Sequence, residues 1–212
     1  GNRTRVSNQT RGLLSEYGIV MPVGIRNVRK HLIDILTDIN EKRLSEFVKP
    51  HFNNLYEELL HLDDLIQTID KALKAYFNQN EACQRLASLP GISIITATAL
   101  VGYLGDISNF KNGRELAAYL GLVPKQHSSG GRELLLGISK RGDSYLRTLL
   151  IHGSRSVLKV AETKKDKDSL WLIDVKTRRG YNKAAVAQAN KTARRVWALL
   201  ANETQYEIQQ AA

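Results

Sequence analysis

Apolar residues in the first part of the chain recur at alternating intervals of three and four positions. Before Pro50 the repeat comprises Ile25, Val28, Leu32, Ile35 and Ile39. After Pro50 it comprises Leu55, Leu59, Leu62, Ile66, Ile69, Leu73 and Tyr76. A heptad repeat keeps one stripe of a helix facing a partner helix, so residues 1–80 are predicted to form a linker helix and a coiled coil.

The sequence alone does not decide which helix packs against this apolar stripe. A helix over 25–48 could fold back on a helix over 52–77 within one chain. Alternatively, the long helix could pair with a second copy, giving a homo-oligomer, a dimer or a tetramer. An ordinary amphipathic helix that covers a globular core would show a similar pattern.

A glycine turn between two apolar helical segments follows. The sequence Leu89-Pro90-Gly91-Ile92 ends one helix, and a second runs through Thr96, Leu100 and Leu104. This pattern predicts a helix-hairpin-helix motif over about 86–105. Such a hairpin aims backbone N–H groups at a phosphate, which makes Gly91 and Ser93 candidate nucleic-acid contacts, although glycine turns between helices are common.

Helical patterns dominate the rest of the chain. A helix over 113–120 precedes a polar, glycine-rich loop at about 125–137, which holds Ser128 and Ser129 and has room for short extended pieces. Further helices are expected from Asp143 onward and over 183–201, separated by a charged turn at 162–169. Because no stretch of any length alternates like a strand, the predicted fold is mainly all-α, with a helical domain at 81–212.

The net charge of +10 lies entirely in the second half. Residues 1–110 carry 12 basic and 12 acidic side chains, whereas residues 111–212 carry 19 and 9. Such asymmetry favours a polyanionic partner, nucleic acid above all. The pair Lys140-Arg141 beside Gly142 is a candidate phosphate grip. The other candidate contacts are Arg147, Arg155, Arg178, Arg179, Arg194 and Arg195, and Lys183 and Lys191 complete the basic clusters.

Three further observations limit the class of protein. Cys83 is the only cysteine, so an internal disulfide is impossible, and the chain suits a reducing cytoplasm. No apolar run approaches the ~18 residues of a membrane span, and no secretory leader opens the sequence. Trp171 and Tyr181 are candidates for base stacking, while Trp197 is expected in the core.

Short motifs follow one another in a specific order across residues 86–153. They are Leu89-Pro90-Gly91-Ile92, Asn109-Phe110, Leu116-Ala117-Ala118-Tyr119-Leu120-Gly121-Leu122-Val123-Pro124, Ser129-Gly130, and Ile138-Ser139-Lys140-Arg141-Gly142 followed by Leu146-Arg147. This set resembles the C-terminal domain of DEDD-type insertion-sequence transposases, relatives of the pilin-gene DNA invertases. Residues 3–24 also resemble the segment that leaves the N-terminal domain of that family.

The resemblance implies an RNA-guided enzyme of bacteria or archaea, active on DNA at the nucleoid. Its N-terminal RuvC-like domain, absent from this chain, would hold Mg²⁺, and the C-terminal domain would supply a serine nucleophile. The serine directly before glycine is the match, so Ser129 is the first choice and Ser128 the second, with His127 a weaker candidate for a base. No cofactor or metal is expected in this chain, where Asp106 and Asp143 are expected to cap helices.

Three functions are therefore compatible with the sequence. The first is the serine-bearing, nucleic-acid-binding portion of a transposase, which alone binds DNA or a structured guide RNA but does not cut. The second is a non-catalytic DNA- or RNA-binding module. The third is an assembly protein whose coiled coil is its main function.

Overall fold

A computed structural model describes residues 1–126 and 135–208 of the chain. Helices make up most of these residues, and the only strands among them form a short two-stranded ribbon, so the prediction of a mainly all-α fold is confirmed. The chain divides into two compact units, residues 1–72 and 73–212. In the part that the structure describes, every helix is too short or too polar to cross a lipid bilayer.

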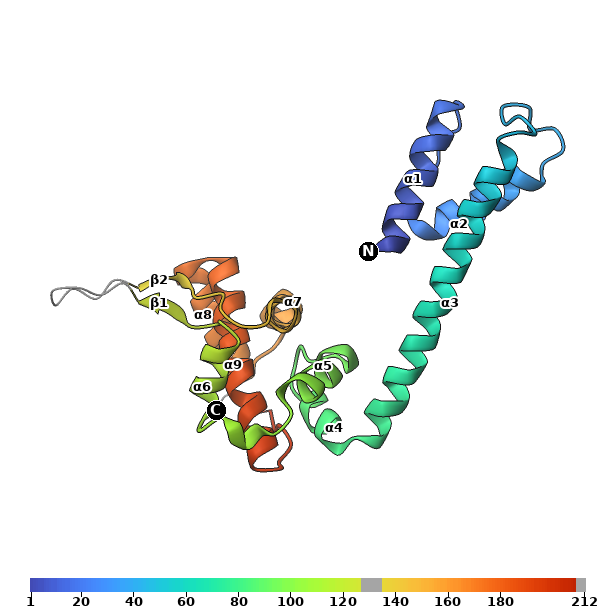
Figure 1. Cartoon of the computed structure of the whole chain (residues 1–212). Helices are drawn as coiled ribbons and strands as arrows, with labels where there is room; N and C mark the ends of the chain where they lie inside the picture. The colour runs from blue at the N-terminus through green and yellow to red at the C-terminus, as the bar shows by residue number, and fades with distance from the viewer. Residues whose placement is uncertain (127–134, 209–212) are drawn as a thin grey trace. The chain divides into compact units, whose positions relative to one another are not determined.

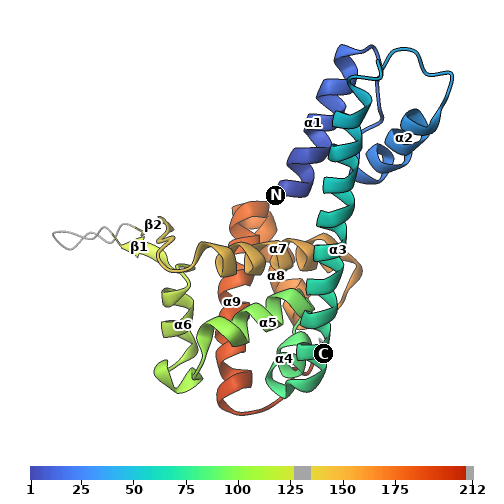
Figure 2. The same cartoon turned by 45° about the vertical axis from the view of Figure 1, so that its right-hand side comes forward.

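The first unit packs two helices against the beginning of a third. Helices α1 (Asn2–Glu16) and α2 (Ile25–Thr37) lie beside the first half of α3 (Lys49–Gln79), as Figures 1 and 2 show. Val6, Leu32, Phe52 and Leu59 are fully or almost fully buried at the centre of this small core.

Some residues of the predicted heptad repeat are buried in the core of the first unit, and others are exposed. Leu55 and Leu59 are buried in the first unit, whereas Ile69 is 57% exposed. The helix expected over 25–48 ends at Thr37, and Ile39 is 94% exposed beyond its end. The reason is local, because the Asp38 carboxylate accepts a hydrogen bond from the Asn40 N–H at 2.8 Å and thereby replaces a helical bond by a turn.

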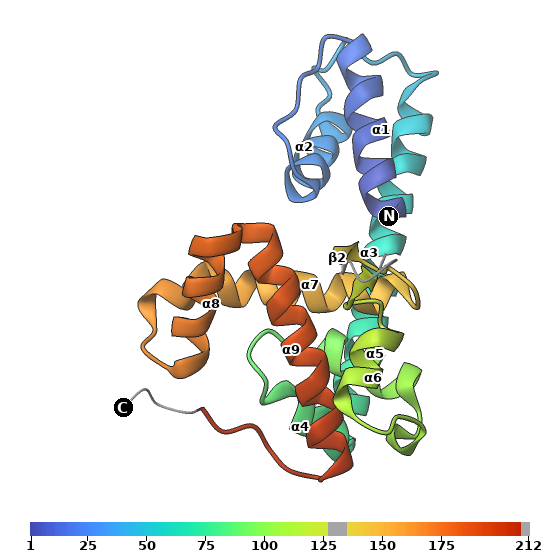
Figure 3. The ribbon, with the colours of Figure 1, turned by 90° about the vertical axis from the view of Figure 1, so that its left-hand side faces the viewer.

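The second unit gathers its helices around α9. Its elements are α4 (Glu81–Ala87), α5 (Ile94–Leu104), η1 (Ile107–Asn109), α6 (Gly113–Tyr119), β1 (Pro124–Gln126), β2 (Leu135–Ile138), α7 (Ser144–Val160), η2 (Ala161–Thr163), α8 (Lys167–Arg179) and α9 (Tyr181–Ala201). Helix α9 has α8 beside its first half and α4 near its second half (Figure 3).

Alanine explains how α9 is packed from several sides. Ala184, Ala185, Ala189 and Ala193 are all fully buried, and alanine both favours helix and lets neighbouring backbones come close. Gly113 lets the backbone of α6 come close to α9, since a Cβ there would lie 2.7 Å from the carbonyl oxygen of Arg194. A larger cluster around Leu100, Leu116 and Val196 forms the main core of this unit.

One expectation about the second unit needs correction. The charged stretch 162–169 was predicted to be a turn, but it contains the end of η2 and the start of α8, which Asp166 caps by accepting a hydrogen bond from the Ser169 N–H at 2.9 Å. At the two ends of the loop predicted at 125–137, β1 and β2 pair as a short antiparallel ribbon. Helix caps at Asp106 and Asp143 are confirmed.

Candidate nucleic-acid interface

A long hollow runs along one face of α9 in the second unit. We call it the α9 groove; its volume is about 1090 Å³. The residues that line it are Asn112, Gly113, Arg114, Leu122, Pro124, Ile138, Trp171, Lys183, Val186, Ala187, Asn190, Lys191, Arg194, Arg195, Trp197 and Ala198. They come from α6 and the residues next to it, the β-ribbon, α8 and α9, so one compact unit supplies the whole lining.

The lining of the α9 groove is cationic at its rim. Its charged members are Arg114, Lys183, Lys191, Arg194 and Arg195, and none of the described lining residues is acidic. Four of these cations lie on α9. Counted from Lys191, Lys183 lies eight residues before, and Arg194 and Arg195 lie three and four residues after, which places them on one helix face. From Lys183 to Trp197 this face extends about 21 Å at ~1.5 Å per residue.

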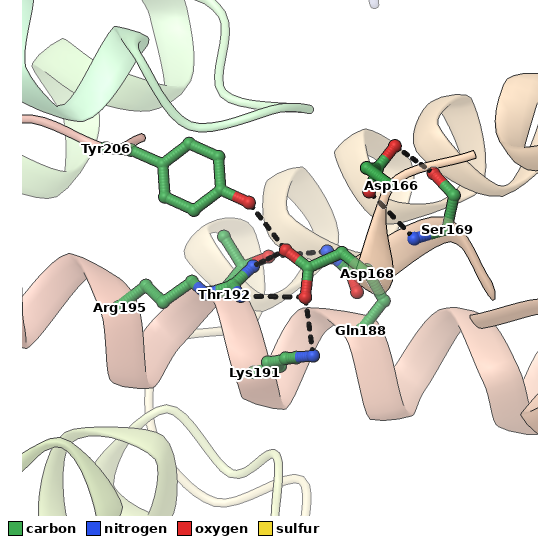
Figure 4. A network of polar contacts seen from close by, with 8 residues as sticks. All are labelled: Asp166, Asp168, Ser169, Gln188, Lys191, Thr192, Arg195 and Tyr206. Atoms are coloured by element: carbon green, nitrogen blue, oxygen red, sulfur yellow. Dashed lines mark hydrogen bonds and ion pairs between the residues drawn. The ribbon is translucent and has the colours of Figure 1, made fainter. Parts of the chain in front are cut away.

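One carboxylate behind the rim organises two of these cations (Figure 4). The Asp168 side chain accepts a hydrogen bond from Lys191 Nζ at 2.7 Å and pairs with the Arg195 guanidinium at 2.6 Å. The Tyr206 hydroxyl, from the segment after α9, donates to the same carboxylate at 2.5 Å. Asp168 therefore fixes the positions of Lys191 and Arg195 on α9.

The contacts within this cluster lower the pKa of Asp168 and raise the pKa of Tyr206. Burial alone would raise the pKa of Asp168, but hydrogen bonds from Arg195, Lys191 and Tyr206 outweigh it and hold the pKa of the carboxyl well below its usual value. Burial and the hydrogen bond to Asp168 raise the pKa of Tyr206 to about 12. Asp168 is thus a carboxylate, and Tyr206 a neutral donor, throughout the physiological range.

The two tryptophans of the groove differ in their contacts. Lys191 Nζ lies 4.1 Å above the centre of the Trp171 ring, a cation–π contact that occupies one face of the ring proposed for base stacking. Trp197 Nε1 donates to the Phe110 carbonyl oxygen at 2.8 Å and the ring packs against the main core, as expected for an anchor.

Among the sequence-predicted contacts, Arg194 and Arg195 line the α9 groove. Arg141 lines a separate hollow of about 730 Å³ with Ser139 and Lys125, at the base of the β-ribbon. Lys140, next to Arg141, is exposed and has a φ of 55°. The predicted phosphate grip and the predicted C-terminal arginines therefore lie in different hollows of the same unit.

Arg147 supports the 139–142 turn. Its guanidinium donates to the carbonyl oxygens of Leu120 at 3.3 Å and of Arg141 at 3.1 Å. Gly121 has a φ of 71° and packs so closely on the Arg141 backbone that a Cβ would collide with it. These contacts give Arg147 a structural role in holding Arg141 against the end of α6.

The glycine turn between α4 and α5 packs on α7. Gly91 has a φ of 87°, and a Cβ there would lie 2.7 Å from the carbonyl oxygen of Gly153. Ser93 caps α5, since its Oγ accepts a hydrogen bond from the Thr96 N–H. Packing alone therefore explains the glycine, and the phosphate contacts predicted for Gly91 and Ser93 remain predictions.

The remaining predicted residues lie outside both hollows. Arg178 pairs with Asp174 at 2.7 Å on the exposed side of α8, and Arg179 is exposed in the last turn of the same helix. The Arg155 guanidinium donates to Asn182 Oδ1 at 3.4 Å. Ser128, Ser129 and His127 lie outside the residues that the structure describes.

Two residues of this region were missed in the sequence. Arg114 lines the groove from α6. Asp168, at the start of α8, lies behind the rim and pairs with Lys191 and Arg195; neither residue shares a local pattern with α9. Lys183 and Lys191 were visible only as members of basic clusters. Within residues 1–126 and 135–208, no group of three or more His, Cys, Asp or Glu side chains is placed to hold a metal ion.

Comparison with known proteins relates most of the chain to transposases. Residues 83–168 match the family model described as Transposase IS116/IS110/IS902 family. The chain is 47% identical over 205 residues to the transposase for insertion sequence element IS1111A of Coxiella burnetii, covering 97% of this chain and 56% of that protein. A probable family 20 transposase of Pseudomonas aeruginosa is 41% identical over 96% of this chain and 60% of its own length.

A more distant relative is named for a different DNA rearrangement. The pilin gene-inverting protein of Moraxella bovis is 27% identical over 61% of this chain and 46% of its own length. The chain spans little more than half the length of the Coxiella burnetii and Pseudomonas aeruginosa proteins. By sequence, this chain is related to the transposases of the IS116/IS110/IS902 family.

Proposed function

We propose that the chain is the C-terminal, nucleic-acid-binding and serine-bearing portion of a DNA transposase. The observation that carries this proposal is the transposase-family match over residues 83–168, in the unit that holds the α9 groove. That unit, residues 73–212, contains 21 basic and 11 acidic residues. A cationic surface of this kind binds the phosphates of nucleic acid.

The proposed chemistry is DNA strand exchange through a covalent serine link. The Ser129 hydroxyl oxygen attacks a backbone phosphorus and loses its proton to a base, while the P–O bond to the leaving deoxyribose hydroxyl breaks. A hydroxyl of another strand then attacks the phosphoserine, forms the new phosphodiester and releases the serine.

Divalent metal does not fit the described residues, which offer no suitable cluster. The proposal therefore assigns Mg²⁺ to a RuvC-like N-terminal domain of the DEDD type in a longer protein, and derives no step from it here. It also includes a structured guide RNA, a cytoplasmic location at the nucleoid, and a homo-oligomer formed through α3.

The first test is binding of the chain to duplex DNA and structured RNA across a salt series. Each neutralised phosphate should contribute about −0.9 to the slope of log K against log salt for duplex DNA. Binding with a steep slope supports the proposal, and negligible binding at low salt contradicts it.

The serine is tested by Ser129→Ala in a longer protein that contains the metal-binding domain, with Ser128→Ala as the matched control. Loss of strand exchange by Ser129→Ala alone, with DNA affinity retained, supports Ser129 as the nucleophile. Unchanged strand exchange by Ser129→Ala would exclude Ser129 as the nucleophile and favour a non-catalytic binding role for this portion.

A further inference from the structure

The floor of the α9 groove is apolar, unlike its rim. Its buried or half-buried apolar members are Leu122, Val186, Ala187, Trp197 and Ala198, whereas the cations Arg114, Lys183 and Arg194 are exposed. Interfaces with duplex DNA are more polar than interfaces between proteins, since a duplex presents mainly phosphates and sugars. An apolar floor below a cationic rim instead matches unpaired nucleotides, which expose both apolar base faces and phosphates.

We propose that the α9 groove holds an unpaired stretch of nucleic acid, with phosphates on the cationic rim and bases against the apolar floor. This inference rests on the nucleic-acid-binding function proposed above and specifies its ligand. A length of about 21 Å accommodates about six nucleotides at the ~3.4 Å rise per nucleotide of a duplex strand, and fewer where an unpaired strand is more extended.

The cations of the rim fall into two kinds. Lys191 and Arg195 are fixed by Asp168 and are 30% and 27% exposed, so little side-chain entropy is lost when they contact a phosphate. Arg114, Lys183 and Arg194 also line the groove and are exposed. The fixed pair therefore sets the position of the strand, and the exposed cations follow its backbone.

Trp171 contributes through Lys191. Its ring lies under the ammonium group, so the groove offers this cation a second contact besides Asp168. Bases are therefore assigned to the part of the floor formed by Val186, Ala187 and Trp197.

The test compares oligonucleotides of about 12 residues, long enough to exceed the groove, with the whole chain at one salt concentration. Oligothymidine and oligouridine are the unpaired probes, and a mixed-sequence DNA duplex of equal length is the paired one. We expect tighter binding of at least one unpaired probe than of the duplex. The difference between the DNA and RNA probes identifies the preferred sugar.

Arg194→Ala tests the rim, with Arg26→Ala, on α2 of the first unit, as a matched loss of one exposed arginine outside the groove. Arg194→Ala should weaken binding of the unpaired probe about tenfold, as for loss of a charged hydrogen bond, and lower the salt slope by about 0.7, the contribution of one phosphate of a single strand. Arg26→Ala should change affinity by less than about twofold.

Ala187→Asp tests the floor by placing a carboxylate beneath the bases, and its thermal unfolding shows whether the variant is folded. Duplex affinity equal to or above that of both unpaired probes would overturn the inference, as would equal effects of Arg194→Ala and Arg26→Ala. Either result would leave the proposed binding of nucleic acid by this chain intact. Failure to bind any nucleic acid would overturn the proposed function as well.

Discussion

At Asp168, a single carboxylate receives donors from Lys191, Arg195 and Tyr206. Its side chain is 22% exposed, so the ion pairs are partly shielded from water and are stronger than pairs on the surface. Removing the charge would leave two half-buried cations close together. The cluster therefore stabilises the contact between α8 and α9 as well as shaping the groove.

Asp168→Asn should lower the free energy of unfolding by about 2 kcal/mol at neutral pH, because charge-assisted hydrogen bonds are lost in a partly buried site. Urea unfolding measures this change. Asp174→Asn is the matched control, since Asp174 also lies on α8 and pairs with an arginine, but both side chains are more than half exposed. It should have almost no effect, and equal effects of the two variants would contradict the role given to Asp168.

The stability difference between wild type and Asp168→Asn should also depend on pH. The pKa of Asp168 is lowered in the folded state, so its stabilisation is present above the unfolded pKa of about 3.9 and is lost as pH falls towards the folded value. Unfolding measured from pH 7 down to acid should show the two proteins converging below about pH 4. A constant difference over this range would exclude Asp168 ionisation as its source.

Sequence alone could identify the charges of this cluster but not their pairing. Arg194 and Arg195 were predicted as nucleic-acid contacts from charge asymmetry, which reports only the number of cations in a region. The partners of Asp168 lie 23, 27 and 38 residues away, and no local repeat links such positions. By contrast, the caps at Asp106 and Asp143 were predictable because a cap contacts residues two or three positions later.

At the scale of elements, the contact between the α4–α5 turn and α7 depends on two glycines. A Cβ on Gly153 would overlap the Gly91 carbonyl oxygen. Gly153→Ala should therefore lower the free energy of unfolding by about 2 kcal/mol through overpacking, as measured by urea unfolding.

Gly102→Ala provides the opposite control within α5. Gly102 is helical and exposed, and nothing lies within 4 Å of a Cβ placed there. Alanine should increase stability by about 0.5–1 kcal/mol at this position, since it favours helix. A destabilisation by Gly102→Ala equal to that of Gly153→Ala would show that the close contact with Gly91 is not the cause.

Elements were predictable where their signals are local. The turn at Gly91 and the helix from Asp143 follow from glycine and cap residues, while the helix expected over 25–48 was wrong after Thr37 because Asp38 and Asn40 form a turn. Helix α8 was missed since its lysine-rich start resembles a solvated turn. Its stability in the fold comes from burial of Leu172 and from Asp168, contacts that depend on α9.

At the scale of the whole molecule, the two units differ in charge and have separate cores. Residues 1–72 carry ten basic and ten acidic side chains, so the entire excess of positive charge lies in residues 73–212. Each unit buries its own apolar cluster. The second unit should therefore fold and bind nucleic acid without the first.

A fragment of residues 73–212 should unfold cooperatively and bind the preferred oligonucleotide within about twofold of the whole chain, with the same salt slope, because the slope counts neutralised phosphates. A fragment of residues 1–72, with no net charge, should bind weakly at any salt concentration. Fluorescence anisotropy across a salt series measures both. If the 73–212 fragment is folded but its slope is shallower, then α1–α3 contact phosphates directly, and the positive charge of the second unit would not by itself determine where nucleic acid lies.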